Sequence, residues 1–477
     1  MLEGSRRCLV LAATSLLMVA TLLSPPRVAE AAPAPGQVSF STLSLFPAFG
    51  PNIEDYVVRC HDAPVTVQAH ASEGWQVSLG GQPFHSGDFS ATVPLGSGRA
   101  FVVRAQKQAE LYRYHVRCLP NSFPTYTFTR YGPVSPKYFA VSRSDLNYGI
   151  IFDNHGVPIW WIRATSWAIR VLPNGNVLWY RGPSHRFEIH RLDGTMIRAL
   201  KSVGYDVDGH DLQFLPNGDH LVSAPVLQRH VDTSAYGGSS DATVKSAELQ
   251  QVTSSGQLVW RWNTYDHISL AETGRWWNAP PTDQQPYDIV HWNSIESAGD
   301  SVIASFRHLD AVYKIKKSTG EIVWKLGGTT TPESLTVIGD PRAYTFGAQH
   351  DARLLPDGTL SVFDNRTNLS NPMPRAVRFR IDEQARTATF LGSITDPAVS
   401  DSGCCGSARR LANGDWLINW AMTRNHPVGG YKPNGERTFF LTFPPRSTYR
   451  AEPVPPGALT AEDLRAAMQT RCSSGCY

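Results

Sequence analysis

The sequence predicts an all-β protein in which a small β-sandwich domain precedes a six-bladed β-propeller. Two observations lead to this prediction. Short alternating strands separated by Gly, Pro and Ser turns occupy residues 38–130, and a strand–turn–strand pattern then recurs through residues 138–450. The length of 477 residues allows a large core with a second, smaller domain beside it.

The recurring pattern is a strand, a turn centred on glycine and a second strand. Most of these turns read Asn-Gly or Asp-Gly, which are typical of β-hairpins, and four short strands per repeat make one propeller blade. Five repeats are marked by their turns, and the strands at both ends of the region indicate a sixth. The interval between the second and third turns is the longest, which indicates an insertion within residues 227–288. The turn glycines are Gly175, Gly218, Gly299, Gly358 and Gly414.

The two ends of the chain have patterns of their own. Residues 1–31 read as a cleaved secretory signal, with a basic pair, an apolar run and a small-residue cleavage site. The apolar run is too short to cross a bilayer, so we expect a secreted or periplasmic protein. Residues 451–477 form a C-terminal tail, in which residues 461–469 read as a short helix capped by Thr460.

The cysteines that remain after signal removal form an even set in an oxidising compartment, so disulfides are expected. Cys60 and Cys118 end two look-alike segments, which suits a bridge between two strands of the small domain. The sequence does not fix how the others pair. A zinc site is the rival interpretation, but the spacings match no metal-ligand pattern. The other four cysteines are Cys404, Cys405, Cys472 and Cys476.

Charge narrows the class of partner. The formal net charge is +3, spread along the chain rather than gathered in Lys/Arg blocks. Such a distribution argues against nucleic-acid and membrane partners. We therefore expect a small-molecule substrate or a protein partner, and the sequence leaves open whether the chain forms a homo-oligomer.

Three histidines share one position in successive repeats. The residue eight positions before the turn glycine is His210 in the second repeat, His291 in the third and His350 in the fourth. The same step in the first and fifth repeats reaches Trp167 and Gly406. Because the offset is identical, we expect the three imidazoles to start the inner strands of their blades and to converge on the mouth of the central channel.

An arginine accompanies these histidines. Counting eight residues forward from the turn glycine gives Arg307 in the repeat of His291 and Arg366 in the repeat of His350. Arg307 is therefore expected on the strand that pairs with the His291 strand. Imidazoles beside a guanidinium suit an anionic, trigonal group, because arginine offers planar donors and histidine can act as nucleophile, acid or base near neutral pH.

Each of these residues also has an ordinary structural interpretation. A single His-Asp pair such as His210-Asp211 or His350-Asp351 is more often a strand-end hydrogen-bonding pair than a catalytic one. Arg307 alone is more often a solvated or salt-bridged arginine. The register shared by three histidines favours a common site. A competing explanation is that the repeats simply inherited a histidine at this position.

Several segments resemble the arylsulfate sulfotransferase family, the bacterial arylsulfotransferases that work without PAPS. The resemblance is carried by His291-Trp-Asn-Ser-Ile-Glu296, by Ala304-Ser-Phe-Arg-His308 with Ala311-Val-Tyr-Lys-Ile315, and by Gly347-Ala-Gln-His-Asp351 with its following turn. It extends over nearly the whole chain after the signal, including the small N-terminal β-domain.

The resemblance implies an aryl sulfate:phenol sulfotransferase with a ping-pong mechanism. His350 then takes up the sulfuryl group as a sulfohistidine, and His210, His291 and Arg307 surround the transferred group. One of the other histidines serves as general acid and base, and the scheme requires neither a nucleotide cofactor nor a metal. The aromatic residues near the histidines suit a pocket for flat phenols, although such residues are more often propeller core. They are Trp276, Trp277, Trp292 and Tyr344.

Two other classes of function remain open from the sequence. One is a non-enzymatic secreted propeller that binds a protein or a glycan. The other is a metal-dependent hydrolase that uses the three histidines as ligands. A quinone-cofactor dehydrogenase is less favoured, because the blade turns contain no convincing set of calcium ligands.

Overall fold

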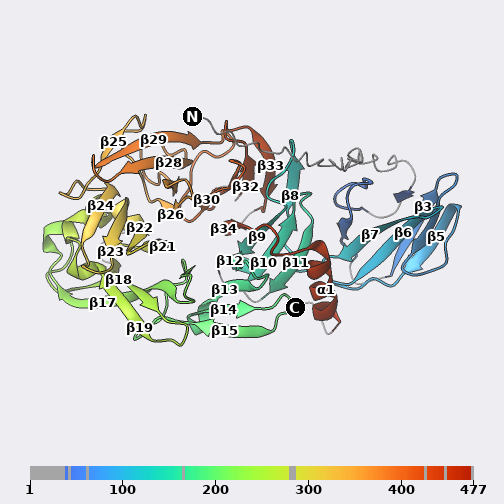
Figure 1. Ribbon diagram of the computed structural model, residues 1–477, viewed down its shortest axis with the longest axis horizontal. Coiled ribbons are helices and arrows are strands. Elements are labelled where there is room, and N and C mark those ends of the chain that lie inside the picture. Colours follow the sequence, from blue (N-terminus) through green and yellow to red (C-terminus); the bar gives the residue numbers. More distant parts are fainter. Residues whose placement is uncertain are drawn as a thin grey trace, which may run out of the picture.

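The computed structural model describes residues 38–40, 44–60, 64–163, 167–278, 286–423, 427–444 and 448–473. The predicted signal at residues 1–31 and the predicted disulfide cysteine Cys476 lie outside these residues. The described part of the chain is nearly all β, and its one α-helix is α1 (Ala461–Cys472) (Figure 1). Within the same residues, no helix has the length and apolar character needed to cross a membrane.

The main body consists of sheets set around a common centre in a propeller-like arrangement (Figure 1). Its first three sheets are β11(Pro158–Arg163)-β10(Tyr148–Asp153)-β9(Tyr138–Arg143)-β34(Thr448–Pro453), β12(Ile169–Val171)-β13(Val177–Arg181)-β14(Arg186–His190)-β15(Met196–Leu200) and β16(Gln213–Phe214)-β17(His220–Val231)-β18(Ala242–Val252)-β19(Leu258–Asn263), with β20(Tyr287–Asp288) beside β18. The next three are β21(Trp292–Ala298)-β22(Ser301–Phe306)-β23(Ala311–Lys316)-β24(Ile322–Gly327), β26(His350–Leu354)-β27(Thr359–Asp364)-β28(Arg375–Asp382)-β29(Thr387–Ile394)-β25(Thr336–Ile338) and β30(Ser407–Arg410)-β31(Trp416–Asn419)-β32(Val428–Tyr431)-β33(Arg437–Thr442)-β8(Thr127–Arg130).

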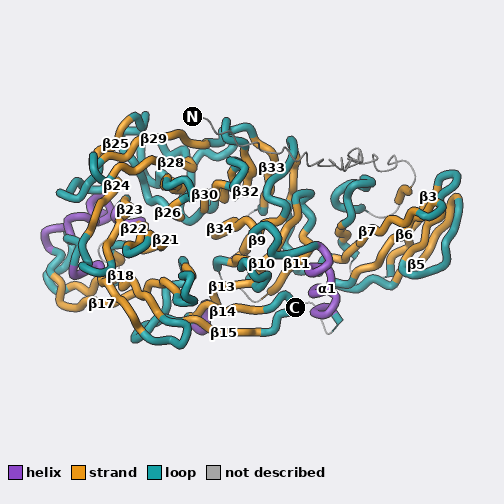
Figure 2. Tube along the Cα trace, in the orientation of Figure 1, coloured by secondary structure: helices purple, strands orange, loops and turns teal. Residues whose placement is uncertain are grey.

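One edge strand of each sheet lies at the centre of this body. These strands contact one another in the order β16, β21, β26, β30, β34 and β12. Figure 2 shows the helical segments away from this centre. Side chains on the central strands of different sheets therefore meet, although they are far apart in the sequence.

Strands from the two ends of the body complete its first and last sheets. β34 pairs with β9, and β8 pairs with β33. The sequence predicts residues 127–130 in the N-terminal domain and a propeller that ends at residue 450, whereas the structure puts β8 and all of β34 in sheets of the main body. Covering an otherwise free sheet edge with a distant strand explains both differences, because an unpaired edge exposes backbone hydrogen-bonding groups.

The N-terminal unit contains two sheets that share an apolar core. The sheets are β1(Val38–Phe40)-β3(Val65–Ala71)-β5(Gly87–Val93) and β2(Asp55–Val58)-β7(Glu110–Cys118)-β6(Ala100–Lys107)-β4(Gln76–Leu79). The Cys60–Cys118 disulfide links the chain just after β2 to the end of β7 and confirms that predicted pair.

Helix α1 connects the two parts of the molecule. It packs against β11 of the main body, and its Arg465 forms ion pairs with Asp55 and Glu54 of the N-terminal unit. Thr460 caps the helix as predicted: its hydroxyl accepts from the Asp463 backbone N–H at 3.1 Å, and the Asp463 carboxylate accepts in return.

Replacing Thr460 tests this cap. Thr460→Ala removes the acceptor for the Asp463 N–H and should lower the free energy of unfolding by about 1 kcal/mol. Thr460→Ser keeps the hydroxyl and is the matched control, which should retain most of the stability. Urea titration of both variants provides the measurement, and equal losses in the two would contradict the capping role.

Candidate active site

The three register-matched histidines lie at the start of central strands. His210 precedes β16, His291 precedes β21 and His350 is the first residue of β26. Arg307 directly follows β22, and its backbone N–H donates to the His291 carbonyl at 2.8 Å. The histidines thus occupy comparable places in three successive sheets, as the repeat predicts. Arg307, expected on the strand that pairs with the His291 strand, is the first residue after that strand.

Ring contacts connect two of these histidines to the arginine. The ring centroids of His210 and His291 are 5.2 Å apart, and those of His291 and His308 are 4.8 Å apart. Arg307 Nη1 lies 2.7 Å from His308 Nε2. His308, which sequence analysis does not single out, therefore bridges the imidazole pair and the guanidinium.

The segment around Cys405 connects the arginine to the third histidine. Arg307 Nη2 donates to the Gly403 carbonyl at 3.1 Å, and the Cys405 backbone N–H points at His350 Nε2 at 3.3 Å. The structure therefore brings all four predicted residues into one cluster.

Neighbouring oxygens define the tautomer of His350. Its Nδ1 lies 2.9 Å from both the Ala348 carbonyl and Asn365 Oδ1. The amide of Asn365 has this orientation because its Nδ2 donates to the Cys405 carbonyl at 3.0 Å. Both oxygens facing Nδ1 only accept hydrogen bonds, so Nδ1 carries the proton and Nε2 presents its lone pair.

The surroundings keep His350 neutral. Its side chain is buried, with a relative exposure of 1%. Burial lowers the pKa of His350 well below its usual value, and the nearby Arg307 and His291 lower it further. A neutral imidazole with a lone pair on Nε2 has the form that a nitrogen nucleophile requires.

The other two histidines have carboxylates as partners. His210 Nδ1 contacts Asp208 Oδ1, and His291 Nδ1 lies 3.0 Å from Asp288 Oδ2. A carboxylate on Nδ1 fixes the ring and stabilises the imidazolium, as in Asp-His pairs that transfer protons. Desolvation lowers the pKa of His291, and Asp288 opposes that effect.

Arg307 is held in a cationic form between aromatic and imidazole groups. Its guanidinium lies 4.3 Å from the ring centre of Trp276. Burial lowers the pKa of Arg307 to about 10, so it stays charged at neutral pH. Burial also lowers the pKa of His308 to about 3, so the His308 ring is neutral. Its Nε2 accepts a hydrogen bond from Arg307, and its Nδ1 donates to the Asp288 carbonyl at 2.6 Å. Within the described part of the chain, Arg307 Nε is buried without a hydrogen-bond partner.

One group of residues has the donor types of a metal site. Ligand atoms of Asp288, His291 and His308 lie within 4.8 Å of one another. Two cations already occupy this group, because Lys245 Nζ lies 2.7 Å from Asp288 Oδ2 and Arg307 donates to His308. The positive charge favours an anion here rather than a metal ion, and neither His210 nor His350 belongs to the group.

Most of the remaining residues suggested by the sequence lie away from the histidines. Arg366 contacts Asp364 and the Tyr344 carbonyl, Tyr344 is 64% exposed and Trp277 is a core residue. Trp292 is also a core residue, but its ring lies 6.4 Å from the His210 ring, edge to face.

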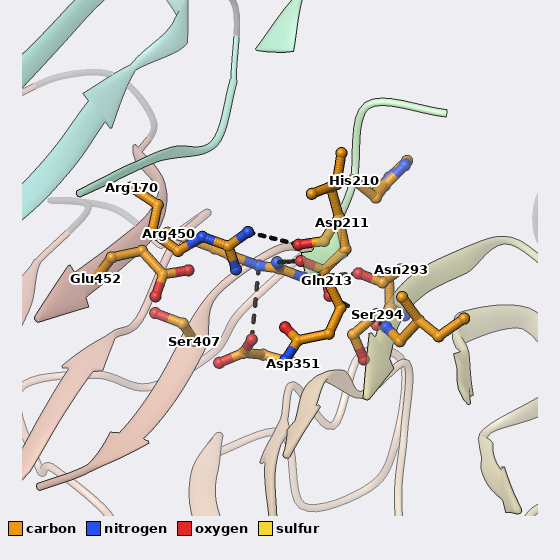
Figure 3. Close-up of polar contacts among 12 residues, drawn as sticks. Arg170, His210, Asp211, Gln213, Asn293, Ser294, Asp351, Ser407, Arg450 and Glu452 are labelled. Atoms are coloured by element: carbon orange, nitrogen blue, oxygen red, sulfur yellow. Dashed lines mark hydrogen bonds and ion pairs between the residues drawn. The ribbon is translucent and has the colours of Figure 1, made fainter. Parts of the chain in front are cut away.

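A buried ion network lies among the central strands, close to His210 (Figure 3). Its hub is Arg450, whose Nη1 lies 3.2 Å from Asp211 Oδ1 and whose Nε lies 3.7 Å from Asp351 Oδ1. Arg450 Nη2 also donates to the Asn293 carbonyl at 2.6 Å. Further charged side chains of the network are Arg170, Glu296, Arg353, Arg409 and Glu452.

The network keeps its carboxylates ionised. Burial alone would raise the pKa of Asp211 and of Asp351, but the surrounding arginines hold both below the usual value. Asp211 follows His210 and Asp351 follows His350 in the sequence. The charge network therefore fixes the backbone directly beside two of the histidines.

The fold and the site together define a propeller-like protein with a cluster of imidazoles and a guanidinium suited to an anionic group. The sequence model of the family "Arylsulfotransferase (ASST)" matches residues 127–438, which is most of the chain. The chain belongs to the arylsulfotransferase family. This membership supports a general role as an aryl sulfotransferase acting on small molecules.

Solved structures similar to this chain are remote in sequence. A protein of unknown function from Bacteroides caccae is 12% identical with a TM-score of 0.42, covering 67% of this chain and 100% of its own. The β-propeller domain of Cps50 (Swd1) from Myceliophteria thermophila is 15% identical with a TM-score of 0.38, covering 69% of this chain and 89% of its own. TolB from Acinetobacter baumannii is 12% identical with a TM-score of 0.38, covering 74% of this chain and 79% of its own. No curated protein matches the sequence significantly.

Arg450 provides a test of the ion network. Arg450→Met leaves Asp211 and Asp351 short of a buried cation and should lower the free energy of unfolding by about 3–5 kcal/mol. Arg378→Met is the matched control, because Arg378 forms a partly exposed pair with Asp357 and should cost less than about 1 kcal/mol. Denaturant unfolding measures both, and similar small losses would contradict a central role for Arg450.

Proposed function

We propose that this protein transfers a sulfuryl group from an aryl sulfate ester to a phenol through a covalent sulfohistidine at His350. The observation that carries the proposal is the form of His350: neutral, protonated on Nδ1, with the Nε2 lone pair in a cluster that contains Arg307. Family membership supports the choice of a sulfuryl group over other anionic groups.

In the first half-reaction, His350 Nε2 attacks the sulfur of the aryl sulfate. The new N–S bond forms as the bond between sulfur and the aryl oxygen breaks, and the phenolate leaves. Arg307 stabilises the charge on the sulfuryl oxygens, a role that its buried, unpartnered Nε supports. A proton from the Nε2 of His210 or His291 converts the phenolate into phenol.

In the second half-reaction, an acceptor phenol replaces the first. Its hydroxyl gives a proton to the histidine that has lost one, and its oxygen attacks the sulfur. The N–S bond then breaks and His350 is regenerated. The Asp-His pairs of His210 and His291 support this proton transfer in both directions, because a carboxylate on Nδ1 stabilises the transient imidazolium.

An aromatic group beside His210 supports an aryl substrate. The Trp167 ring lies 5.2 Å from the His210 ring and stacks on Tyr449 at 5.6 Å. Trp167 is 37% exposed, so a flat ring can reach it. We place the phenyl ring of donor and acceptor on this side of the cluster.

The proposal includes the architecture and the location of the protein. We propose that the six described sheets of the main body are the blades of one propeller, and that the N-terminal unit is a β-sandwich. We further propose that a signal at residues 1–31 directs export.

The His350→Ala variant tests the nucleophile. Transfer from a chromogenic aryl sulfate to phenol should fall by about a thousandfold or more, because the variant lacks the proposed nucleophile. His230→Ala is the control, since His230 pairs with Asp241 in an exposed position and its loss should leave the rate unchanged. Equal rates for His350→Ala and the unaltered protein would end the assignment.

The same assay separates the other classes of function. Loss of activity on chelation, restored by a divalent metal, would favour a metal-dependent hydrolase. Absence of any turnover or covalent labelling with aryl sulfates would favour a protein-binding or glycan-binding propeller.

The lowered pKa of His350 predicts a flat pH profile for sulfuryl uptake. A group whose pKa lies well below about 6.5 stays deprotonated between about pH 6 and pH 8. With a donor whose leaving group needs no protonation, the single-turnover rate of phenol release should therefore stay constant over this range. A tenfold fall per pH unit below about pH 6.5 would show an ordinary imidazole instead.

A further inference from the structure

Adjacent cysteines at the active-site cluster form a disulfide. Cys404 and Cys405 are bonded to each other, so their side chains close a ring that contains the peptide bond between them. The backbone of Cys405 has φ +66°, a left-handed conformation uncommon for a residue with a side chain. Two-electron reduction would open the ring and release this constraint.

The peptide bond inside this ring faces His350. Its N–H, from Cys405, points at Nε2 of His350 at 3.3 Å. Asn365 connects the two further, because its Nδ2 donates to the Cys405 carbonyl at 3.0 Å while its Oδ1 accepts from His350 Nδ1 at 2.9 Å. The neighbouring Gly403 carbonyl accepts from Arg307 at 3.1 Å. The ring therefore lies between the two groups assigned to the sulfuryl transfer.

From this geometry we propose that the Cys404–Cys405 disulfide positions the Cys405 backbone N–H as a donor to the transferring sulfuryl group, and that reduction of the bond switches transfer off. The inference rests on the proposed function. When Nε2 bonds to sulfur, it ceases to be an acceptor, and the Cys405 N–H then faces the sulfuryl oxygens. A backbone donor fixed in advance stabilises charge in the transition state without reorganisation.

The switch reaction is thiol–disulfide exchange with a dithiol. The dithiol gives two electrons and two protons, the S–S bond breaks into two thiols, and the dithiol becomes its own disulfide. Cys404 and Cys405 are partly exposed, whereas Cys60 and Cys118 are 6% and 0% exposed. A dithiol should therefore reach the active-site pair before the pair in the N-terminal unit.

The test follows activity and thiols together in the full-length oxidised protein. Dithiothreitol is added in steps, one portion is assayed for transfer, and another is alkylated with iodoacetamide and mapped by peptide mass spectrometry. As thiols appear at Cys404 and Cys405, kcat should fall at least roughly tenfold, with the KM for the donor changed much less. Removal of the dithiol and reoxidation should restore kcat.

The double variant Cys404→Ser/Cys405→Ser complements this titration. It should have the low kcat of the reduced protein and should not respond to dithiothreitol. If dithiothreitol lowers the kcat of that variant further, the effect belongs to another disulfide and the inference is overturned. Should the variant fail to fold, the reversible titration of the unaltered protein still decides.

The outcomes separate the inference from the function on which it rests. An oxidised protein that transfers sulfuryl groups, with kcat unchanged after both thiols form, would overturn the inference and leave the function standing. An oxidised protein without transfer activity would overturn both.

Discussion

Arg450 lies on the closing strand β34 and contacts Asp211, the Asn293 carbonyl and Asp351, which come from three other sheets. Its side chain is 1% exposed. Burying Arg450 and its carboxylate partners costs free energy unless each charge is paired with an opposite one. The central strands must therefore keep the arrangement in which these charges are paired. Two of those partners are sequence neighbours of active-site histidines. The same ionic constraint thereby fixes the backbone beside the proposed site of sulfuryl transfer.

Neighbouring atoms give chemically identical side chains different tasks. His350 has two neutral oxygens on Nδ1 and stays an uncharged ring, whose Nε2 lone pair faces the Cys405 backbone N–H. His210 and His291 have carboxylates at the same atom, which favours gain and loss of a proton. His308 accepts from Arg307 and keeps the guanidinium in place. In the proposed function these residues serve as a nucleophile, proton carriers and a cation, for a group that is anionic throughout the reaction.

The sequence predicts the part of this arrangement that follows the repeat. A shared offset from the turn glycine identifies His210, His291 and His350, because one register position recurs from repeat to repeat. Contacts between different sheets do not recur at a fixed spacing in the sequence. His308 gains its role from a backbone carbonyl in another segment, and Asn365 reaches both His350 and the Cys405 ring across two sheets. The pairing of β8 with β33 is equally remote in sequence. Local patterns cannot reveal partners that only the folded chain brings together.

Locating the covalent intermediate tests whether His350 carries the sulfuryl group. The protein is mixed with an aryl sulfate in the absence of any phenol acceptor, quenched at alkaline pH to preserve an acid-labile N–S bond, and digested for peptide mass spectrometry. We expect one sulfuryl group per chain, carried by His350. A group on another residue, or phenol release without any bound group, would contradict it.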